Sequence, residues 1–123
     1  MLNKKWKSKP YLKWVASHQC ILCMYHECQA HHITIAEKRG ISQKVSDFWT
    51  IPLCYAHHGQ LHHTGERRFW LKLGIDPKDI ATKFYELWLK DDKNNMEYVQ
   101  TEIYDKLLPT IKSNIDFLMQ VKY

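Results

Sequence analysis

Three short clusters of cysteine and histidine between residues 20 and 63 constrain this chain more than any other feature. The first is Cys20-Ile-Leu-Cys23, the second is the pair His31-His32, and the third is the run Cys54-Tyr-Ala-His57-His58-Gly-Gln-Leu-His62-His63. Thiolates and imidazoles in this number are enough for two metal sites. The sequence therefore predicts a fold that is organised around bound metal.

The composition bears on size and compartment. A chain of 123 residues with 45% hydrophobic content suits one compact domain, or a small domain with an appendage. No apolar run approaches the ~20 residues that cross a bilayer, and no apolar segment of a signal peptide follows the first lysines. We therefore expect a cytoplasmic protein, whose four cysteines are reduced thiols rather than disulfides.

One predicted site is structural. Cys-x-x-Cys followed at a distance by Cys-x-x-His is a zinc pattern, and a Cys3His set closes a tetrahedron. Its expected ligands are Cys20, Cys23, Cys54 and His57. Cys28 is left over; it can replace one of these ligands, but we expect it to be a buried free thiol.

The second predicted site is catalytic. A helix from Tyr55 to about His63 places His58 and His62 one turn apart on one face. With His31 they are candidate ligands for a divalent ion (Mg, Mn, Ni or Zn), and His32 is the candidate general base, because an imidazole accepts protons near neutral pH. Adjacent strand residues point to opposite faces, so His31 and His32 serve one site only if the strand ends or twists there.

The alternative for each of these histidines is a structural role. His18, His26 and His63 lack comparable spacing, and we expect them to lie at the surface or to support the metal ligands.

The local patterns predict an α+β fold. Strands over 29–35 and 48–53 would form an antiparallel hairpin with a long connection, followed by the helix that carries His58 and His62, which is a ββα order. Helices are also expected over 10–17, 66–73 and 77–88. Apolar residues then recur at helical spacing from Met96 to Leu118, with a kink or break at Pro109. The expected organisation is a basic arm (1–10), a metal-binding core with a zinc knuckle (11–75) and a helical extension (76–123) that packs over it.

The formal charge of +5 is concentrated toward the N-terminus, where residues 1–26 contain no acid. A basic segment beside a metal cluster favours a polyanionic partner such as DNA, although a solvated, lysine-rich tail is the alternative. Candidate phosphate contacts are Lys4, Lys5, Lys7, Lys9, Lys38, Arg39, Lys44, Arg67 and Arg68.

Several of these motifs together resemble an HNH, or His-Me finger, endonuclease. The elements are Cys20-x-x-Cys23, Ala30-His31-His32-Ile33, Ile51-Pro52-Leu53-Cys54 and His57-His58. The longer run from Gly40 to Asp47, with Thr50-Ile-Pro-Leu-Cys54, Leu61-His62 and Gly65-Glu66, resembles the recombination-enhancement (Ref-type) nucleases of temperate phages and prophages. The resemblance covers about residues 11–75.

The resemblance implies a ββα-metal (HNH) core and metal-dependent hydrolysis of DNA phosphodiester bonds, in phage or prophage recombination or DNA processing. By this resemblance His32 is the general base, and the ligands of the catalytic ion are His31, His58 and His62. The resemblance also implies a recombinase filament as a partner. The middle Asn of the HNH motif would align at Trp49, which cannot orient a base through an amide. Asp47 or Thr50 is the expected substitute.

A second class of function is a non-catalytic, zinc-stabilised module that binds nucleic acid and holds one ion per chain. A third class, the zinc base deaminases, is disfavoured because His-x-Glu does not occur in the sequence.

Overall fold

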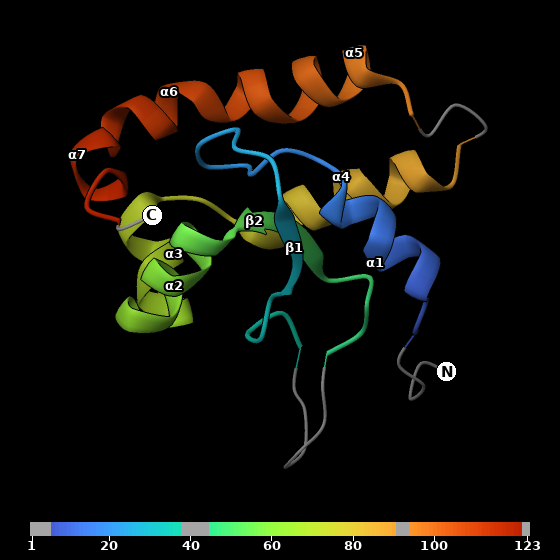
Figure 1. The fold of residues 1–123 in the computed structure, drawn as a ribbon, viewed down its shortest axis with the longest axis horizontal. Helices are drawn as coiled ribbons and strands as arrows, with labels where there is room; N and C mark the ends of the chain where they lie inside the picture. The colour runs from blue at the N-terminus through green and yellow to red at the C-terminus, as the bar shows by residue number, and fades with distance from the viewer. Residues whose placement is uncertain (1–5, 38–44, 91–93, 122–123) are drawn as a thin grey trace.

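The computed structural model of the protein describes residues 6–37, 45–90 and 94–121 (Figure 1). The fold is α+β, with a two-stranded antiparallel sheet and helices around it. The elements are α1 (Lys9–Ala16), β1 (Cys28–His32), β2 (Thr50–Cys54), α2 (Tyr55–Thr64), α3 (Glu66–Leu73), α4 (Pro77–Trp88), α5 (Met96–Val99), the π-helical segment η1 (Gln100–Tyr104), α6 (Asp105–Ser113) and α7 (Ile115–Leu118). Within the described residues no helix has both the length and the apolar character to span a membrane.

The sheet brings the cysteine and histidine clusters together. The register pairs Cys28 with Cys54 at one end and His32 with Thr50 at the other. Figure 1 shows α1 and α4 to one side of the two strands and α2 and α3 to the other, while the C-terminal helices cross along the top of the view. Because α2 follows β2 directly, its first turn lies beside the end of the hairpin that carries Cys54.

Both strands are displaced from their predicted ranges. The first was expected over 29–35 but ends at His32, because the backbone N–H of Thr34 donates to Glu66 Oε1 (3.1 Å) instead of continuing the ladder. The second was expected to start at residue 48 but starts at Thr50. The residues before it form a turn in which Thr50 Oγ1 donates to the carbonyl oxygen of Asp47 (2.9 Å).

Capping residues set the helix boundaries. Ser8 caps α1 by accepting from the backbone N–H of Tyr11, and Asp76 caps α4 in front of Pro77. Helix α2 ends at Gly65, whose φ of 97° is disfavoured for residues with a Cβ. That sharp turn starts α3 immediately after α2 and points Glu66 back toward the sheet, as its contacts with Thr34 show.

A kink or a break was expected at Pro109, and the helix does not break there. Residues Asp105–Ser113 form one helix that contains Pro109, and the helical run is interrupted instead at Asn114. The carbonyl that loses its partner, that of Asp105, lies at an exposed position where water can bond to it. Upstream, the run passes through the π-helical segment η1, where the N–H of Asp105 donates to the carbonyl of Gln100.

One cluster of buried side chains joins the described parts of the chain. It includes Ile21, Leu53, Phe69, Phe84 and Ile103, so the turn of Cys20 and Cys23, the sheet and the C-terminal helices share a core. The last helices are fixed to the rest by polar side chains as well. Asn114 Nδ2 donates to the Leu73 carbonyl (3.0 Å) and Gln60 Nε2 to the Phe117 carbonyl (2.7 Å).

Candidate metal centres

The Cys3His set predicted from the sequence is assembled by the fold. One donor atom from each of Cys20, Cys23, Cys54 and His57 can be chosen so that all four lie within 4.8 Å of one another. Cys23 Sγ lies 3.7 Å from Cys54 Sγ, and His57 Nδ1 lies 3.3 Å from Cys54 Sγ and 4.0 Å from Cys20 Sγ. Tetrahedral zinc with ordinary bond lengths separates two sulfurs by about 3.8 Å and a sulfur from a nitrogen by about 3.6 Å. The set therefore fits a zinc ion.

Local backbone structure holds these four donors in place. Cys20 and Cys23 lie in a turn in which the N–H of Leu22 donates to Cys20 Sγ (3.5 Å) and the N–H of Met24 to the Cys20 carbonyl (2.8 Å). Cys54 ends β2 and is also the N-cap of α2, where its sulfur accepts from the N–H of His57 (3.4 Å). The two halves of the site thus come from the knuckle and from the junction between the sheet and α2.

The cluster has the electrostatics of a site that is prepared for a cation. A hydrogen bond from the Cys20 thiol lowers the pKa of Cys54 to about 6 against the effect of burial. Burial opposes protonation of His57, but its contacts with Cys23 and with the carbonyl of Leu118 raise its pKa to about 9. These shifts favour the thiolate form of Cys54 and the protonated form of His57. A divalent ion would replace the proton that they share.

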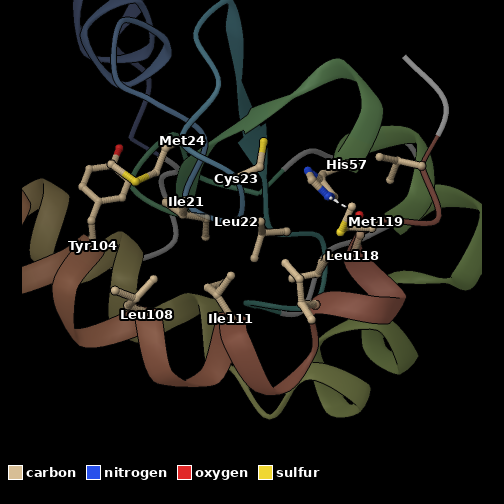
Figure 2. A pocket seen from close by; sticks show the side chains of 12 residues that line it. Ile21, Leu22, Cys23, Met24, His57, Tyr104, Leu108, Ile111, Leu118 and Met119 are labelled. Carbon is tan, nitrogen blue, oxygen red and sulfur yellow. Dashed lines mark hydrogen bonds between the residues drawn. The ribbon is translucent and has the colours of Figure 1, made fainter.

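The ring of His57 also reaches the C-terminal helices. Its Nε2–H donates to the carbonyl oxygen of Leu118 at 3.0 Å, which leaves Nδ1 for the thiol cluster. Figure 2 shows this bond beside a cavity of about 490 Å³ between the knuckle and the C-terminal helices. Most side chains that line the cavity are apolar, among them Ile21, Leu22 and Ile111. The structural site is thus linked directly to the helical extension.

The rings of the three predicted catalytic ligands lie near one another, two on α2 and one on β1. The ring centroid of His58 lies 5.1 Å from that of His31 and 4.4 Å from that of His62. His58 Nε2 and His62 Nε2 are 3.1 Å apart, which matches the separation of about 3.0–3.4 Å between two nitrogens on one ion. His31 faces the pair from β1, with its centroid 6.4 Å from that of His62. Burial, followed by the interaction with His31, lowers the pKa of His58, which keeps it in the neutral form that binds metal.

Glu66 joins this second site, and the sequence did not identify it as a site residue. His31 Nε2–H donates to Glu66 Oε2 at 2.8 Å, and Trp70 Nε1–H donates to the same oxygen at 2.7 Å. Burial disfavours the charged form of Glu66. The hydrogen bonds outweigh it, the one from His31 having the largest effect, and they lower the pKa of Glu66 to about 2. The signal available in the sequence was a carboxylate one turn beyond His62, after a glycine that reverses the chain.

His32 is oriented by a different carboxylate. Its Nε2–H donates to Asp47 Oδ1 at 2.8 Å, and the ring is 29% exposed. The two adjacent histidines of β1 therefore contact different partners, His31 at α3 and His32 at the turn before β2. A neutral His32 held in this way carries its proton on Nε2 and has Nδ1 as its acceptor.

Asp47 also anchors the N-terminal segment. Its Oδ2 accepts from the backbone N–H of Ser8 (2.8 Å), and its own N–H donates to the carbonyl of Trp6 (2.9 Å). Thr50, the other expected substitute for the HNH asparagine, holds the carbonyl of Asp47. Asp47 thus lies between His32 and the residues that flank the exposed Lys7.

Replacement of Asp47 by alanine should destabilise the protein by about 1–3 kcal/mol, because it leaves the N–H of Ser8 and the ring of His32 without their acceptor. Urea unfolding followed by circular dichroism measures this loss. Asp79→Ala is the matched control, since its carboxylate is 65% exposed and pairs with Lys83 across one helical turn; its effect should stay within about 0.5 kcal/mol. Equal losses in the two variants would contradict the anchoring role of Asp47.

The residues expected to contact phosphate fall into two described groups and one group outside the described residues. Lys7 and Lys9 are exposed beside Asp47, and Arg67 and Arg68 are exposed on α3 directly after Glu66. Lys4, Lys5, Lys38, Arg39 and Lys44 lie outside the described residues, as does most of the run from Gly40 to Asp47. The described candidates therefore form two groups, one that flanks Ser8, whose backbone bonds to Asp47, and one that follows Glu66.

Two minor predictions need correction. Cys28 is half-buried rather than buried, and its thiol donates to the Tyr25 carbonyl (3.2 Å), because it lies at the sheet edge beside the knuckle. His18 was expected at the surface or in support of the metal ligands, but it is only 5% exposed and contacts α1 and α4 instead. Its Nδ1 bonds to the Trp14 carbonyl (2.8 Å) and its ring packs on Phe84. His26 and His63 are exposed, as expected.

Comparison with known proteins adds a family but no established activity. No solved structure matches the chain. The uncharacterized protein YdfU of Escherichia coli strain K12 is 30% identical over 60 residues, which is 49% of this chain and 17% of that protein. A family model described as "Protein of unknown function (DUF968)" matches residues 2–87, which include both histidine and cysteine clusters but not the C-terminal helices. The chain therefore belongs to the DUF968 family.

Proposed function

We propose that the protein is a metal-dependent DNA endonuclease of the HNH type, in which β1, β2 and α2 form a ββα-metal core. The observation that carries the proposal is the convergence of three imidazoles from two elements, with the Nε2 atoms of His58 and His62 3.1 Å apart and His31 facing them. Three neutral ligands leave a divalent ion its full charge and leave coordination positions for water or phosphate.

In this proposal the ion supplies Lewis-acid stabilisation of the charge that develops on the scissile phosphate. The side chains of the protein orient the reacting groups and transfer the proton. His32 removes a proton from water through Nδ1, and Asp47 fixes the tautomer that makes Nδ1 the acceptor. Asp47 thus takes the orienting role that Trp49 cannot fill.

DNA is the proposed substrate because exposed basic residues lie beside the pair of His32 with Asp47 and beside the pair of His31 with Glu66. Lys7 and Lys9 lie near His32, and Arg67 and Arg68 follow Glu66. Contacts of this kind bind the phosphate backbone and carry little sequence information, so low intrinsic sequence specificity is expected. The setting in phage or prophage DNA processing and the recombinase filament as a partner follow from the resemblance to Ref-type nucleases alone.

The second candidate is a zinc-stabilised module that binds nucleic acid without cleaving it. The observation that favours it is the difference between the two clusters. The Cys3His donors already lie at bonding separations, whereas the rings of His31 and His62 are 6.4 Å apart and must approach each other to share an ion.

Incubation of supercoiled plasmid with the protein and Mg²⁺, Mn²⁺, Ni²⁺ or Zn²⁺ distinguishes the two candidates. The nuclease proposal predicts nicked or linear DNA with at least one ion and none after chelation of the exchangeable metal. A protein that retards DNA in a gel but leaves the plasmid intact with every ion would support the binding module instead.

A further inference from the structure

Glu66 is the most heavily hydrogen-bonded carboxylate of the second centre. Oε1 accepts from the backbone N–H of Thr34 (3.1 Å) and from its hydroxyl (2.8 Å). Oε2 accepts from Trp70 Nε1–H (2.7 Å) and from His31 Nε2–H (2.8 Å). A carboxylate has about four lone-pair positions, so these four donors saturate it.

The occupation of all its lone pairs limits the role that Glu66 can take in the site. A carboxylate whose lone pairs are all engaged is a poor ligand for a metal ion, because it would have to give up donors that are buried with it. The side chain of Glu66 is 8% exposed and that of His31 is 3% exposed, so water does not readily replace a lost donor. Glu66 therefore acts on the site through His31 and not by coordination.

The same bond determines which nitrogen of His31 is available. A neutral imidazole carries one proton, and an acceptor-only carboxylate at 2.8 Å places that proton on Nε2. The lone pair then resides on Nδ1. Ligating histidines commonly donate their second ring nitrogen to a carboxylate, which fixes the ring and raises its basicity.

We propose that Glu66 is a positioning residue that holds His31 as the Nε2-protonated tautomer, so that His31 binds the ion shared with His58 and His62 through Nδ1. This inference rests on the proposed function only in that it requires a second ion. It also assigns a role to α3, because Glu66 is the first residue of that helix and Trp70 lies one turn further along it. Helix α3 thereby fixes the ring that faces α2 from the sheet.

The test uses the zinc-loaded full-length protein and Zn²⁺ or Mn²⁺ as the second ion. Calorimetric titration should show that Glu66→Gln weakens binding of the second ion by about 10–100-fold, the usual effect of losing such a partner. Zinc content at the cysteine cluster should not change. Thr34→Val is the matched control: it removes one donor from Glu66 and leaves the bond to His31, so it should lower stability without weakening the second ion.

Nitrogen NMR of the protein labelled at histidine reads the tautomer directly. In the wild type, addition of Zn²⁺ should move the Nδ1 resonance of His31 and leave Nε2 protonated; Glu66→Gln should reduce that preference. A second ion that binds the wild type and Glu66→Gln equally, or a zinc-induced shift at Nε2, overturns the inference and leaves the nuclease proposal standing. A wild type that binds no second ion overturns both.

Discussion

Replacing Cys20 with serine should lower the melting temperature by at least about 12 °C or abolish the cooperative transition. Cys20 is fully buried and its sulfur belongs to the Cys3His cluster. Structural zinc contributes ~10–16 kcal/mol of apparent binding energy in small domains, which is as large as the whole stability of a typical domain. A loss of only about 3 kcal/mol already corresponds to the stated shift for a chain of this size.

The loss of stability in Cys20→Ser should extend beyond the turn that carries Cys20 and Cys23. His57 is a member of the cluster and also donates to the Leu118 carbonyl, so removal of the ion frees the ring that holds the C-terminal helices. Hydrogen exchange should therefore increase across α7 as well as around Cys20 in the serine variant. The cavity between these segments is lined mostly by apolar side chains (Figure 2).

Cys28→Ser is the matched control for this experiment. The Cys28 thiol donates to the Tyr25 carbonyl, a bond that a serine hydroxyl can also make, so its cost should remain under about 1 kcal/mol. Differential scanning calorimetry and zinc analysis compare the two variants. A Cys20→Ser protein that melts with the wild type would remove the structural-zinc interpretation.

Replacing His32 with alanine should reduce plasmid cleavage by about 10²–10⁴-fold, the usual contribution of a general base. The side chain contacts Asp47 and not the ring cluster of His31 and His58, so the variant should bind both ions as the wild type does. Initial rates of nicking at saturating metal measure the effect. His26→Ala is the matched control, because His26 is exposed on the knuckle loop.

The two outcomes of the His32 experiment separate binding from chemistry. Loss of cleavage with retained metal supports a base that acts on water. Cleavage at the rate of the wild type would show that another group removes the proton. In that case His32, oriented by Asp47, has a structural role.

Much of the fold was predictable because its signals are local. Cys-x-x-Cys with a distant Cys-x-x-His specified the Cys3His cluster, and the i, i+4 spacing placed His58 and His62 on one face. Capping residues fixed the starts of α1 and α4, and Gly65 and Gly74 marked the ends of α2 and α3. Each of these features depends on neighbours within a few residues in the sequence.

The features that were missed depend on residues far apart in the chain. The role of Glu66 arises only when α3 turns back onto Thr34, 32 positions earlier, and no local pattern encodes that contact. The early end of β1 has the same cause. The burial of His18 depends on Phe84, and the helix tolerates Pro109 because that position is exposed.

The nuclease proposal requires that His31, His58 and His62 share one ion, separate from any ion at the cysteine cluster. Anomalous X-ray scattering from crystals soaked with Mn²⁺ or Zn²⁺ tests it most directly. Two peaks per chain are expected, one among the cysteines and His57 and one bounded by the three imidazoles, with Nδ1 of His31 toward the second. A single peak at the cysteines, at ion concentrations that support cleavage, would contradict it.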